Sequence, residues 1–203
     1  LRIMKETTRD LIGAKVWENA LSVGTHIPAF QLPDANRRRI QIMDFVSDKD
    51  YTVIIFYRGA WCPFCNMELM AYNRELECFQ AENVDVVAIS PNLPDVSRTT
   101  KEMKNLEFTV LSDAKNIVAS KFGIVFELAK ELRPIYKQWG FMIPEQNGDD
   151  SFNLPLASKF VVDKTGKIIY RYVEADYTKR PEPQEVLEGI MEHKARGEAS
   201  ASQ

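Results

Sequence analysis

The order of apolar and polar positions predicts strands and helices that alternate along the chain. Near-continuous apolar runs are typical of buried strands, and they occupy residues 51–57, 84–90 and 108–111. Segments with a helical spacing of apolar residues follow them, at 66–80, 95–105 and 112–122. A strand, a helix and a second strand within about forty residues predict a parallel βαβ unit with a right-handed crossover. The pattern therefore predicts an α/β protein.

Two further pairs of short runs predict hairpins on either side of this unit. Residues 29–32 and 39–43 alternate around a polar turn, which indicates a short hairpin before the first buried strand. Residues 160–163 and 167–173 flank the turn sequence Lys-Thr-Gly, which indicates a second hairpin late in the chain. The sheet is therefore expected to contain both parallel and antiparallel pairs.

Both ends of the chain have features of their own. Amphipathic spacing predicts helices at 1–21 and 184–194. The last residues are rich in Ala, Ser and Glu and are expected to be disordered. We therefore divide the chain into an N-terminal helix (1–22), one domain (23–194) and a disordered tail (195–203).

The segment before the late hairpin is less regular. Residues 127–140 predict a helix bent at Pro134. Residues 141–153 predict a loop, although this region has more apolar side chains than a solvated loop needs. They line a substrate mouth, contact a second subunit or pack on one another, and the sequence leaves these options open. These side chains are Trp139, Phe141, Met142, Ile143 and Phe152.

One motif carries candidate chemistry, the run Trp-Cys-Pro-Phe-Cys at 61–65, between a predicted strand and a predicted helix. The first N–H groups of a helix lack internal partners, and its macrodipole favours negative charge there. A thiolate at this point is stabilised, so the pKa of the thiol falls. Pro63 suits an early helical position because it lacks an N–H that the helix leaves unpaired. Cys62 and Cys65 lie close enough for a disulfide, so the motif favours a reversible dithiol–disulfide couple.

The two cysteines differ in their expected surroundings. Cys62 lies nearer the mouth of the helix, which favours it as the nucleophile. Cys65 shares an apolar stripe with Leu69 and Tyr72, and burial in apolar surroundings raises the pKa of a thiol. Cys65 is therefore the expected resolving thiol.

Three other side chains near the motif have expected roles. Trp61 is expected to shield a sulfur from water. Arg58 either adds positive charge beside the thiolate or faces solvent. A second apolar stripe on the same helix suggests burial on two sides, which makes Cys78 a small core residue rather than a partner of the motif.

Composition and charge exclude several classes of function. The chain has 203 residues, of which 45% are hydrophobic and 27% charged, as in ordinary globular proteins. A formal net charge of −3 gives no electrostatic footprint for nucleic acid or an anionic membrane. No apolar run approaches the length of a membrane span. Three cysteines are too few for a secreted disulfide framework, so we expect a cytoplasmic protein.

A metal centre is not expected. Zinc needs four ligands, and beyond the two motif cysteines the chain offers Cys78, His26 and His193, none at ligand spacing. No glycine-rich phosphate loop is present either. We therefore expect neither a metal nor an organic cofactor.

The order of elements and three sequence segments resemble the peroxiredoxin-like branch of the alkyl hydroperoxide reductase and thiol-specific antioxidant (AhpC/TSA) superfamily. The segments are Gly24–Asp34, Phe56–Cys65 and Phe160–Ile168, and the resemblance spans residues 23–190. It implies a thioredoxin-like α/β fold in its peroxiredoxin elaboration. This is a central mixed sheet flanked by helices, with an N-terminal hairpin and helix added.

The motif departs from the family pattern at defined positions. Typical peroxiredoxins read Pro-x-x-x-Thr-x-x-Cys, which places Arg58 at the Pro, Cys62 at the Thr and Cys65 at the peroxidatic Cys. Ala157 stands where the family has an Arg before the late strand. In the family register Cys65 attacks, whereas in a thioredoxin-type Trp-Cys-x-x-Cys register Cys62 attacks.

The resemblance implies a thiol-dependent antioxidant oxidoreductase that cycles Cys62 and Cys65 between dithiol and disulfide. Hydrogen peroxide or organic hydroperoxides are the favoured substrates, and a thioredoxin- or glutathione-type thiol would regenerate the enzyme. Two alternatives stay open, a thioredoxin-like protein disulfide reductase and a redox-sensing interaction module with little turnover. The subunits are either single or paired in a homodimer.

Overall fold

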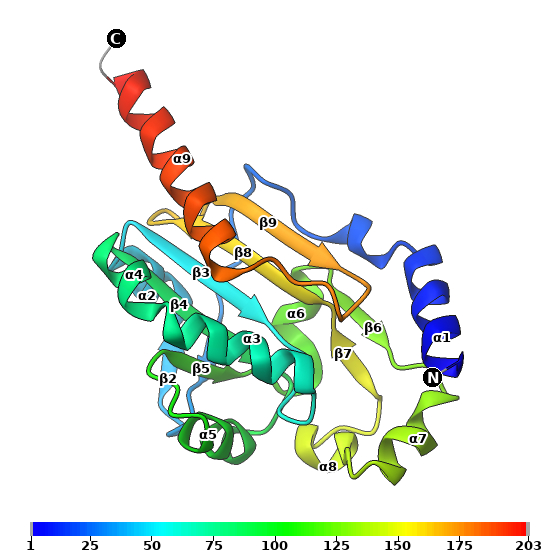
Figure 1. The fold of residues 1–203 in the computed structure, drawn as a ribbon. Helices are drawn as coiled ribbons and strands as arrows, with labels where there is room; N and C mark the ends of the chain where they lie inside the picture. The colour runs from blue at the N-terminus through cyan, green and yellow to red at the C-terminus, as the bar shows by residue number, and fades with distance from the viewer. Residues whose placement is uncertain (1, 202–203) are drawn as a thin grey trace.

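The computed structural model describes residues 2–201 and has a five-stranded mixed sheet at its centre (Figure 1). The strands lie in the order β5-β4-β3-β8-β9. β3 and β4 are parallel, as are β4 and β5, whereas β8 is antiparallel to both β3 and β9. The bounds are β3 Tyr51–Phe56, β4 Val84–Ser90, β5 Thr109–Ser112, β8 Ala157–Asp163 and β9 Ile168–Glu174.

Helices cover both faces of this sheet. Successive side chains of β3 point to opposite faces, so alternate residues pack against different helices. Val53 and Ile55 lie in a core with α3 (Pro63–Arg74), α4 (Leu76–Ala81) and α9 (Pro183–Ala201). Ile54 and Phe56 lie in a second core with α2 (Ile42–Ser47) and α6 (Ile117–Lys121). The central strand is therefore buried on both faces, as its continuous apolar run predicts.

The remaining elements surround the sheet. The early hairpin pairs β1 with β2, and a second small sheet pairs β6 with β7, with two short helices between them in sequence. Helix α5 packs against β5, the strand at one edge of the central sheet. The bounds are α1 Arg2–Gly13, η1 Val16–Asn19, β1 Gln31–Pro33, β2 Arg39–Gln41, α5 Pro94–Met103, η2 Ala114–Asn116, β6 Val125–Glu127, α7 Leu132–Gln138, α8 Ile143–Asn147 and β7 Asn153–Pro155.

The predicted strands, the βαβ unit and both hairpins are confirmed, but the two ends of the chain differ from expectation. The single helix expected at 1–21 is divided into α1 and η1, because Lys15 adopts a left-handed conformation (φ 53°) between them. The tail expected to be disordered from residue 195 continues α9 to Ala201, in keeping with the high helix propensity of Ala and Glu. Residues 202–203 lie outside the described residues.

The helix expected at 66–80 is also divided, between α3 and α4, at Glu75. Its expected burial on two sides is wrong, since Met67 is 58% exposed and Met70 44% exposed. Cys78 is exposed too, so it is not the core residue that the helical pattern suggests. The sheet covers one side of this helix pair, and the second apolar stripe faces away from it.

Between the two strands of the small sheet, the chain is more ordered than the sequence suggests. The segment expected to be a helix begins at Glu127, the last residue of β6, and α7 begins only at Leu132. Pro134 falls in the first turn of α7, where a backbone N–H has no partner within the helix to lose. The expected loop contains α8, and its apolar side chains Phe141, Ile143 and Phe152 pack against the main core. These three side chains therefore pack on the domain, whereas Trp139 is 50% exposed.

The turn from β3 into α3 depends on Gly59, whose φ of 146° is a conformation that other residues rarely adopt. A Cβ at this position would lie 2.6 Å from Nε1 of Trp61. The backbone N–H of Cys62 donates to the Gly59 carbonyl at 3.1 Å, which closes the turn. Gly59 therefore lets the chain reverse sharply enough to bring Cys62 to the start of α3.

A methyl group at Gly59 is expected to destabilise the fold. Gly59→Ala should lower the free energy of unfolding by about 2 kcal/mol, because it combines backbone strain with a contact against the Trp61 ring. Urea denaturation followed by circular dichroism measures the change. The matched control is Gly13→Ala, where no atom lies within 4 Å of the added Cβ, and we expect a change below about 1 kcal/mol. Equal effects of the two substitutions would contradict this account of the turn.

Candidate active site

Cys62 occupies the N-cap position of α3. Its backbone is extended (φ −86°, ψ 113°), and Pro63 begins the helix, as the sequence predicts. The backbone N–H of Cys65 donates to Cys62 Sγ at 3.4 Å, so the sulfur takes the place of a capping oxygen. The sulfur therefore lies at the positive end of the helix, where a thiolate is stabilised.

Arg58 adds a cation to the same sulfur. Its Nη2 donates to Cys62 Sγ at 3.1 Å, and the residue is only 4% exposed. The guanidinium lies 4.0 Å from the centre of the Tyr177 ring and 5.0 Å from that of Trp61. The sequence left open whether Arg58 lies beside the thiolate or faces solvent, and in the structure it lies beside the sulfur. Trp61 contacts this charge as well as helping to enclose the site.

The two cysteines have opposite pKa shifts. The pKa of Cys62 falls to about 5, chiefly because the Cys65 thiol hydrogen-bonds to its thiolate, and further because of the charge of Arg58, while burial opposes the fall. The pKa of Cys65 rises well above its ordinary value because of burial, the hydrogen bond to Cys62 and the negative charge there. Both sulfurs are fully buried. At neutral pH Cys62 therefore carries the negative charge and Cys65 keeps its proton.

Buried asparagines hold the turn before Cys62. Asn92 is fully buried in the loop after β4, and its Oδ1 accepts the N–H of Ala60 at 2.8 Å. Its Nδ2 donates to Oδ1 of Asn147 in α8 at 2.8 Å. Asn66 donates from its side chain to the Ala60 carbonyl at 2.8 Å. These hydrogen bonds fix the turn both to the loop after β4 and to α3. The loop after β4 is in turn held by α8.

Cys65 lies against a buried group of charges. Arg180 Nη2 donates to Cys65 Sγ at 3.5 Å, and Arg180 also pairs with Glu68. Glu68 pairs in turn with Lys159 on β8, and neither residue is more than 6% exposed. Burial lowers the pKa of Lys159, while the carboxylate of Glu68 opposes that shift. The second sulfur thus has a cation of its own, anchored by a carboxylate one helical turn further along α3.

Sequence reasoning missed Glu68, Lys159 and Arg180. Two signals were available, since Glu68 lies three residues after Cys65 on the same helix face and Lys159 interrupts an apolar strand. Arg180 is in an irregular segment with no local signal. Ala157, at the position where the family has its arginine, is buried and carries no charge. Positive charge comes instead from Arg58 and Arg180.

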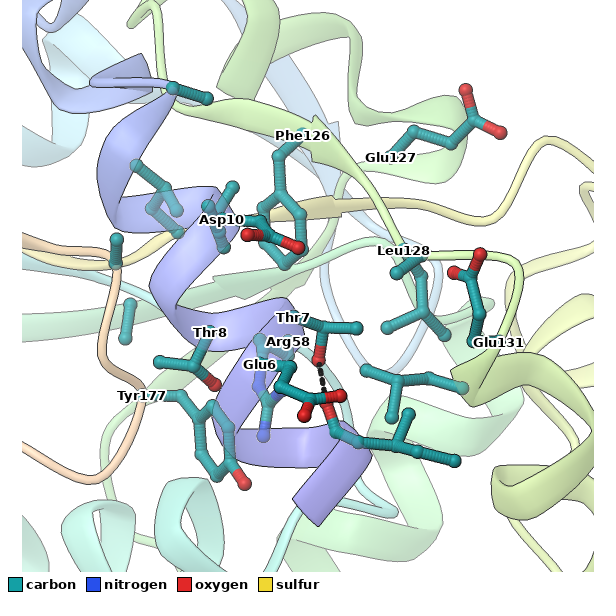
Figure 2. A pocket seen from close by; sticks show the side chains of 18 of the residues that line it. Glu6, Thr7, Thr8, Asp10, Arg58, Phe126, Glu127, Leu128, Glu131 and Tyr177 are labelled. Atoms are coloured by element: carbon teal, nitrogen blue, oxygen red, sulfur yellow. Dashed lines mark hydrogen bonds between the residues drawn. The ribbon is translucent and has the colours of Figure 1, made fainter.

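A cavity of about 490 Å³ opens beside Arg58. It lies between α1 and the segment from β6 to α7, with Tyr177 at the same end as Arg58 (Figure 2). Within residues 2–201, no group of three or more His, Cys, Asp or Glu side chains is placed to hold a metal ion. None of the helices in this part of the chain is long and apolar enough to cross a bilayer.

A mixed five-stranded sheet with a Cys-x-x-Cys pair at the start of the helix after its central strand defines a thioredoxin-like thiol protein. Comparison with known proteins gives the family. A model of the AhpC/TSA family matches residues 23–171, so the chain belongs to the AhpC/TSA family. The resemblance found in the sequence is therefore confirmed.

Similar proteins carry peroxiredoxin names. Peroxiredoxin Bcp of Escherichia coli K12 is 26% identical over 178 residues, covering 86% of this chain and 99% of that protein. A bcp relative from Buchnera aphidicola subsp. Schizaphis graminum is 32% identical over 158 residues, covering 76% and 96%. The solved structure of a yeast mitochondrial 1-Cys peroxiredoxin has a TM-score of 0.68 at 19% identity, covering 88% of this chain and 78% of that one. The predicted thioredoxin-like α/β fold is thus confirmed.

Removing the Arg58 charge is expected to raise the pKa of Cys62. In the wild type, the alkylation rate of Cys62 should rise with pH to a midpoint near 5 and then level off, because only the thiolate reacts. In Arg58→Met, the midpoint should move up by more than about one pH unit. Alkylation at a series of pH values, read by mass spectrometry, measures both. Arg98→Met removes an exposed arginine and should leave the midpoint in place, and an unmoved midpoint in Arg58→Met would rule out the proposed contribution of Arg58.

Removing the Glu68 charge is expected to destabilise the protein. Glu68→Gln leaves Lys159 and Arg180 as buried cations without their shared anion, so the free energy of unfolding should fall by about 3–5 kcal/mol. The control is Glu82→Gln, which breaks the half-exposed pair with Lys194 and should cost at most about 1 kcal/mol. Urea denaturation of both variants makes the comparison. If the two losses are alike, the buried charges do not depend on Glu68.

Proposed function

We propose that this protein is a thiol-dependent peroxidase that reduces hydrogen peroxide or organic hydroperoxides, with Cys62 as the nucleophile and Cys65 as the resolving thiol. The observation that supports this most directly is the Cys62 sulfur, which is held as a thiolate by the Cys65 N–H, the Cys65 thiol and Arg58. Membership of the AhpC/TSA family and relatives named peroxiredoxins give independent support.

In the first step the Cys62 thiolate attacks one oxygen of the peroxide. A sulfur–oxygen bond forms and the oxygen–oxygen bond breaks, which leaves a sulfenic acid on Cys62. The second oxygen leaves as hydroxide or alkoxide and takes up a proton. Arg58 lies against the sulfur, where its N–H groups stabilise the negative charge that develops on the leaving oxygen.

In the second step Cys65 attacks the Cys62 sulfur. A disulfide forms, the sulfur–oxygen bond breaks, and the proton of Cys65 leaves with the hydroxyl group as water. Arg180, 3.5 Å from Cys65 Sγ, stabilises the thiolate that attacks. Burial still raises the pKa of Cys65 once Cys62 has become a neutral sulfenic acid, but the further rise caused by the negative charge of Cys62 is gone. The order of the two steps therefore follows from the electrostatics of the pair.

An external thiol then reduces the disulfide. We propose a thioredoxin- or glutathione-type reductant, because the similar yeast 1-Cys peroxiredoxin is resolved via glutathione and thioredoxin systems. The incoming thiolate attacks Cys62, and Cys65 leaves as a thiolate next to Arg180. The expected cytoplasmic location and the choice between monomer and homodimer stay predictions.

One observation favours a second candidate, a protein disulfide reductase. Arg58 occupies the position of the family Pro, Cys62 that of the family Thr and Ala157 that of the family Arg, so three features of the peroxidase pattern are replaced. A Cys-x-x-Cys pair with a reactive first thiol and a buried second one also suits exchange with a disulfide. A redox-sensing module with little turnover stays a third hypothesis.

The nucleophile can be identified with single cysteine variants. In a Cys78→Ser background, Cys65→Ser should still consume one equivalent of hydrogen peroxide and hold a sulfenic acid that dimedone traps on Cys62. Cys62→Ser should lose this reaction by more than about a hundredfold, because the low-pKa thiol is gone. Stopped-flow kinetics and mass spectrometry measure the rate and the trapped residue.

Three outcomes count against the proposal in different ways. Trapping on Cys65 in the Cys62→Ser variant would make Cys65 the nucleophile, as in the family register. Rapid reduction of insulin without peroxide consumption would indicate the disulfide reductase. Loss of neither activity in the double variant would remove both cysteines from the chemistry.

A further inference from the structure

We propose that Lys159 is a positioning residue for the resolving step, in which Cys65 attacks the Cys62 sulfur. Lys159 occupies one oxygen of the Glu68 carboxylate. Arg180 therefore keeps a donor and a positive charge for Cys65. This inference rests on the proposed function, because a resolving step exists only where Cys62 is oxidised. It assigns a role to a buried group that the two steps described above do not use.

A lysine is costly at this position. Lys159 is fully buried on β8, and its neighbours in sequence, Ser158 and Phe160, are fully buried too. Replacing buried ion pairs by apolar side chains of similar volume is often neutral or even stabilising, so such pairs are weak evidence for a role in stability. The place of this lysine beside the Cys65 group points to a role in the chemistry instead.

The register of the sheet brings Lys159 to the helix that carries both cysteines. Lys159 lies opposite Ile55 in the antiparallel pair of β8 with β3, and opposite residues share one face of a sheet. Ile55 belongs to the core on the α3 side. The ammonium group therefore reaches α3, where it pairs with Glu68 Oε1. Its Nζ also lies 5.1 Å from the centre of the Tyr172 ring, and both contacts favour the charged form of the lysine.

Each nitrogen of the Arg180 guanidinium has an acceptor of its own. Nε donates to the Tyr177 carbonyl at 3.1 Å. Nη1 donates to Glu68 Oε2, and Nη2 donates to Cys65 Sγ at 3.5 Å. Arginine and carboxylate groups frequently pair through two parallel hydrogen bonds, which would take both Glu68 oxygens. Lys159 blocks this geometry because it occupies Oε1, so Nη2 stays available for the sulfur.

Lys159 also sets the balance of charge around Cys65. Two cations, Lys159 and Arg180, share the single negative charge of Glu68, so one positive charge is left over. When Cys65 gives up its proton to attack, the negative charge of the thiolate balances this surplus. Without Lys159, the pair of Glu68 and Arg180 would be neutral by itself. The thiolate would then form in a dry interior without an opposite charge of its own, which is costly.

Other titratable and charged groups also act on Cys65. Tyr57 follows β3, Arg58 begins the turn and Cys62 caps the same helix. Tyr57 is uncharged at neutral pH because burial raises its pKa to about 12. Arg58 is always charged, and Cys62 is a neutral sulfenic acid when the resolving step begins. A change in the pH dependence of this step on removal of Lys159 therefore reports the ionisation of Cys65.

The first test removes the charge of the lysine and keeps most of its volume. In Lys159→Met, the rate of disulfide formation relative to that of sulfenic acid formation should fall about tenfold at neutral pH. The curve of resolving rate against pH should move up by about one pH unit, because the Cys65 thiolate forms only at higher pH. Stopped-flow fluorescence and acid quench with mass spectrometry follow the two steps. Lys194→Met, which breaks the half-exposed pair with Glu82, is the matched control and should change neither value.

A double variant separates this role from a structural one. In Lys159→Met, Glu68→Gln, the anion is removed together with the lysine, so Arg180 keeps its whole charge, and the amide offers it one oxygen only. The relative resolving rate should therefore return to within about threefold of the wild type. A lysine that only supports the fold predicts a larger loss in the double variant than in the single one. Circular dichroism and Tm establish that the variants are folded.

A second readout does not depend on peroxide. In a Cys62→Ser, Cys78→Ser background, the ultraviolet absorbance of the thiolate gives the pKa of Cys65. Lys159→Met should raise this pKa by about one pH unit, and the added Glu68→Gln should bring it back. An unchanged Cys65 pKa in Lys159→Met, or a double variant that resolves no faster than the single one, overturns the proposal. If the wild type consumes no peroxide while the Cys65 pKa moves as expected, the proposed function fails and the effect of Lys159 on this thiol stands.

Discussion

The contact between the Arg58 guanidinium and the Cys62 sulfur is the interaction on which the site depends. A buried cation and a buried thiolate are each costly alone, and together they neutralise one another at 3.1 Å. The rings of Trp61 and Tyr177 lie on the guanidinium and exclude water from the pair. The Cys62 thiolate is therefore stable in otherwise apolar surroundings, where hydration does not reduce its reactivity.

Much of the surrounding structure can be understood as support for this contact. The left-handed turn at Gly59 aims Cys62 at the helix terminus, and the buried side chain of Asn92 holds the turn in place. Arg180 and Glu68 repeat the same device one step deeper, with a cation beside the second sulfur and a carboxylate behind the cation. The two sulfurs consequently lie in one dry region but in different electrostatic fields.

The sequence predicts the parts of this arrangement that depend on local chemistry. The apolar run at 51–57 and the position of Pro63 follow from strand and helix-terminus rules that act over a few residues. These rules also give the direction of the Cys62 pKa shift, although its largest cause is the hydrogen bond from the Cys65 thiol. The contact between Glu68 and Arg180 spans more than a hundred residues, so no local pattern reveals it. The prediction that Cys78 is a core residue was wrong for a related reason. Helical spacing identifies one face of a helix, but it does not show whether another element covers that face. Whether Arg58 lies beside the sulfur or faces solvent likewise could not be decided without the folded structure.

The burial of Arg58 has a consequence for the redox potential of the cysteine pair. When the sulfurs join in a disulfide, the anion opposite Arg58 disappears, and this cation faces an uncharged group in a dry interior, whereas Arg180 keeps its pair with Glu68. The protein therefore stabilises the dithiol form more than the disulfide form. This shifts the equilibrium of the cysteine pair toward the reduced state. This difference between the two forms favours a more oxidising cysteine pair than two thiols in water would make.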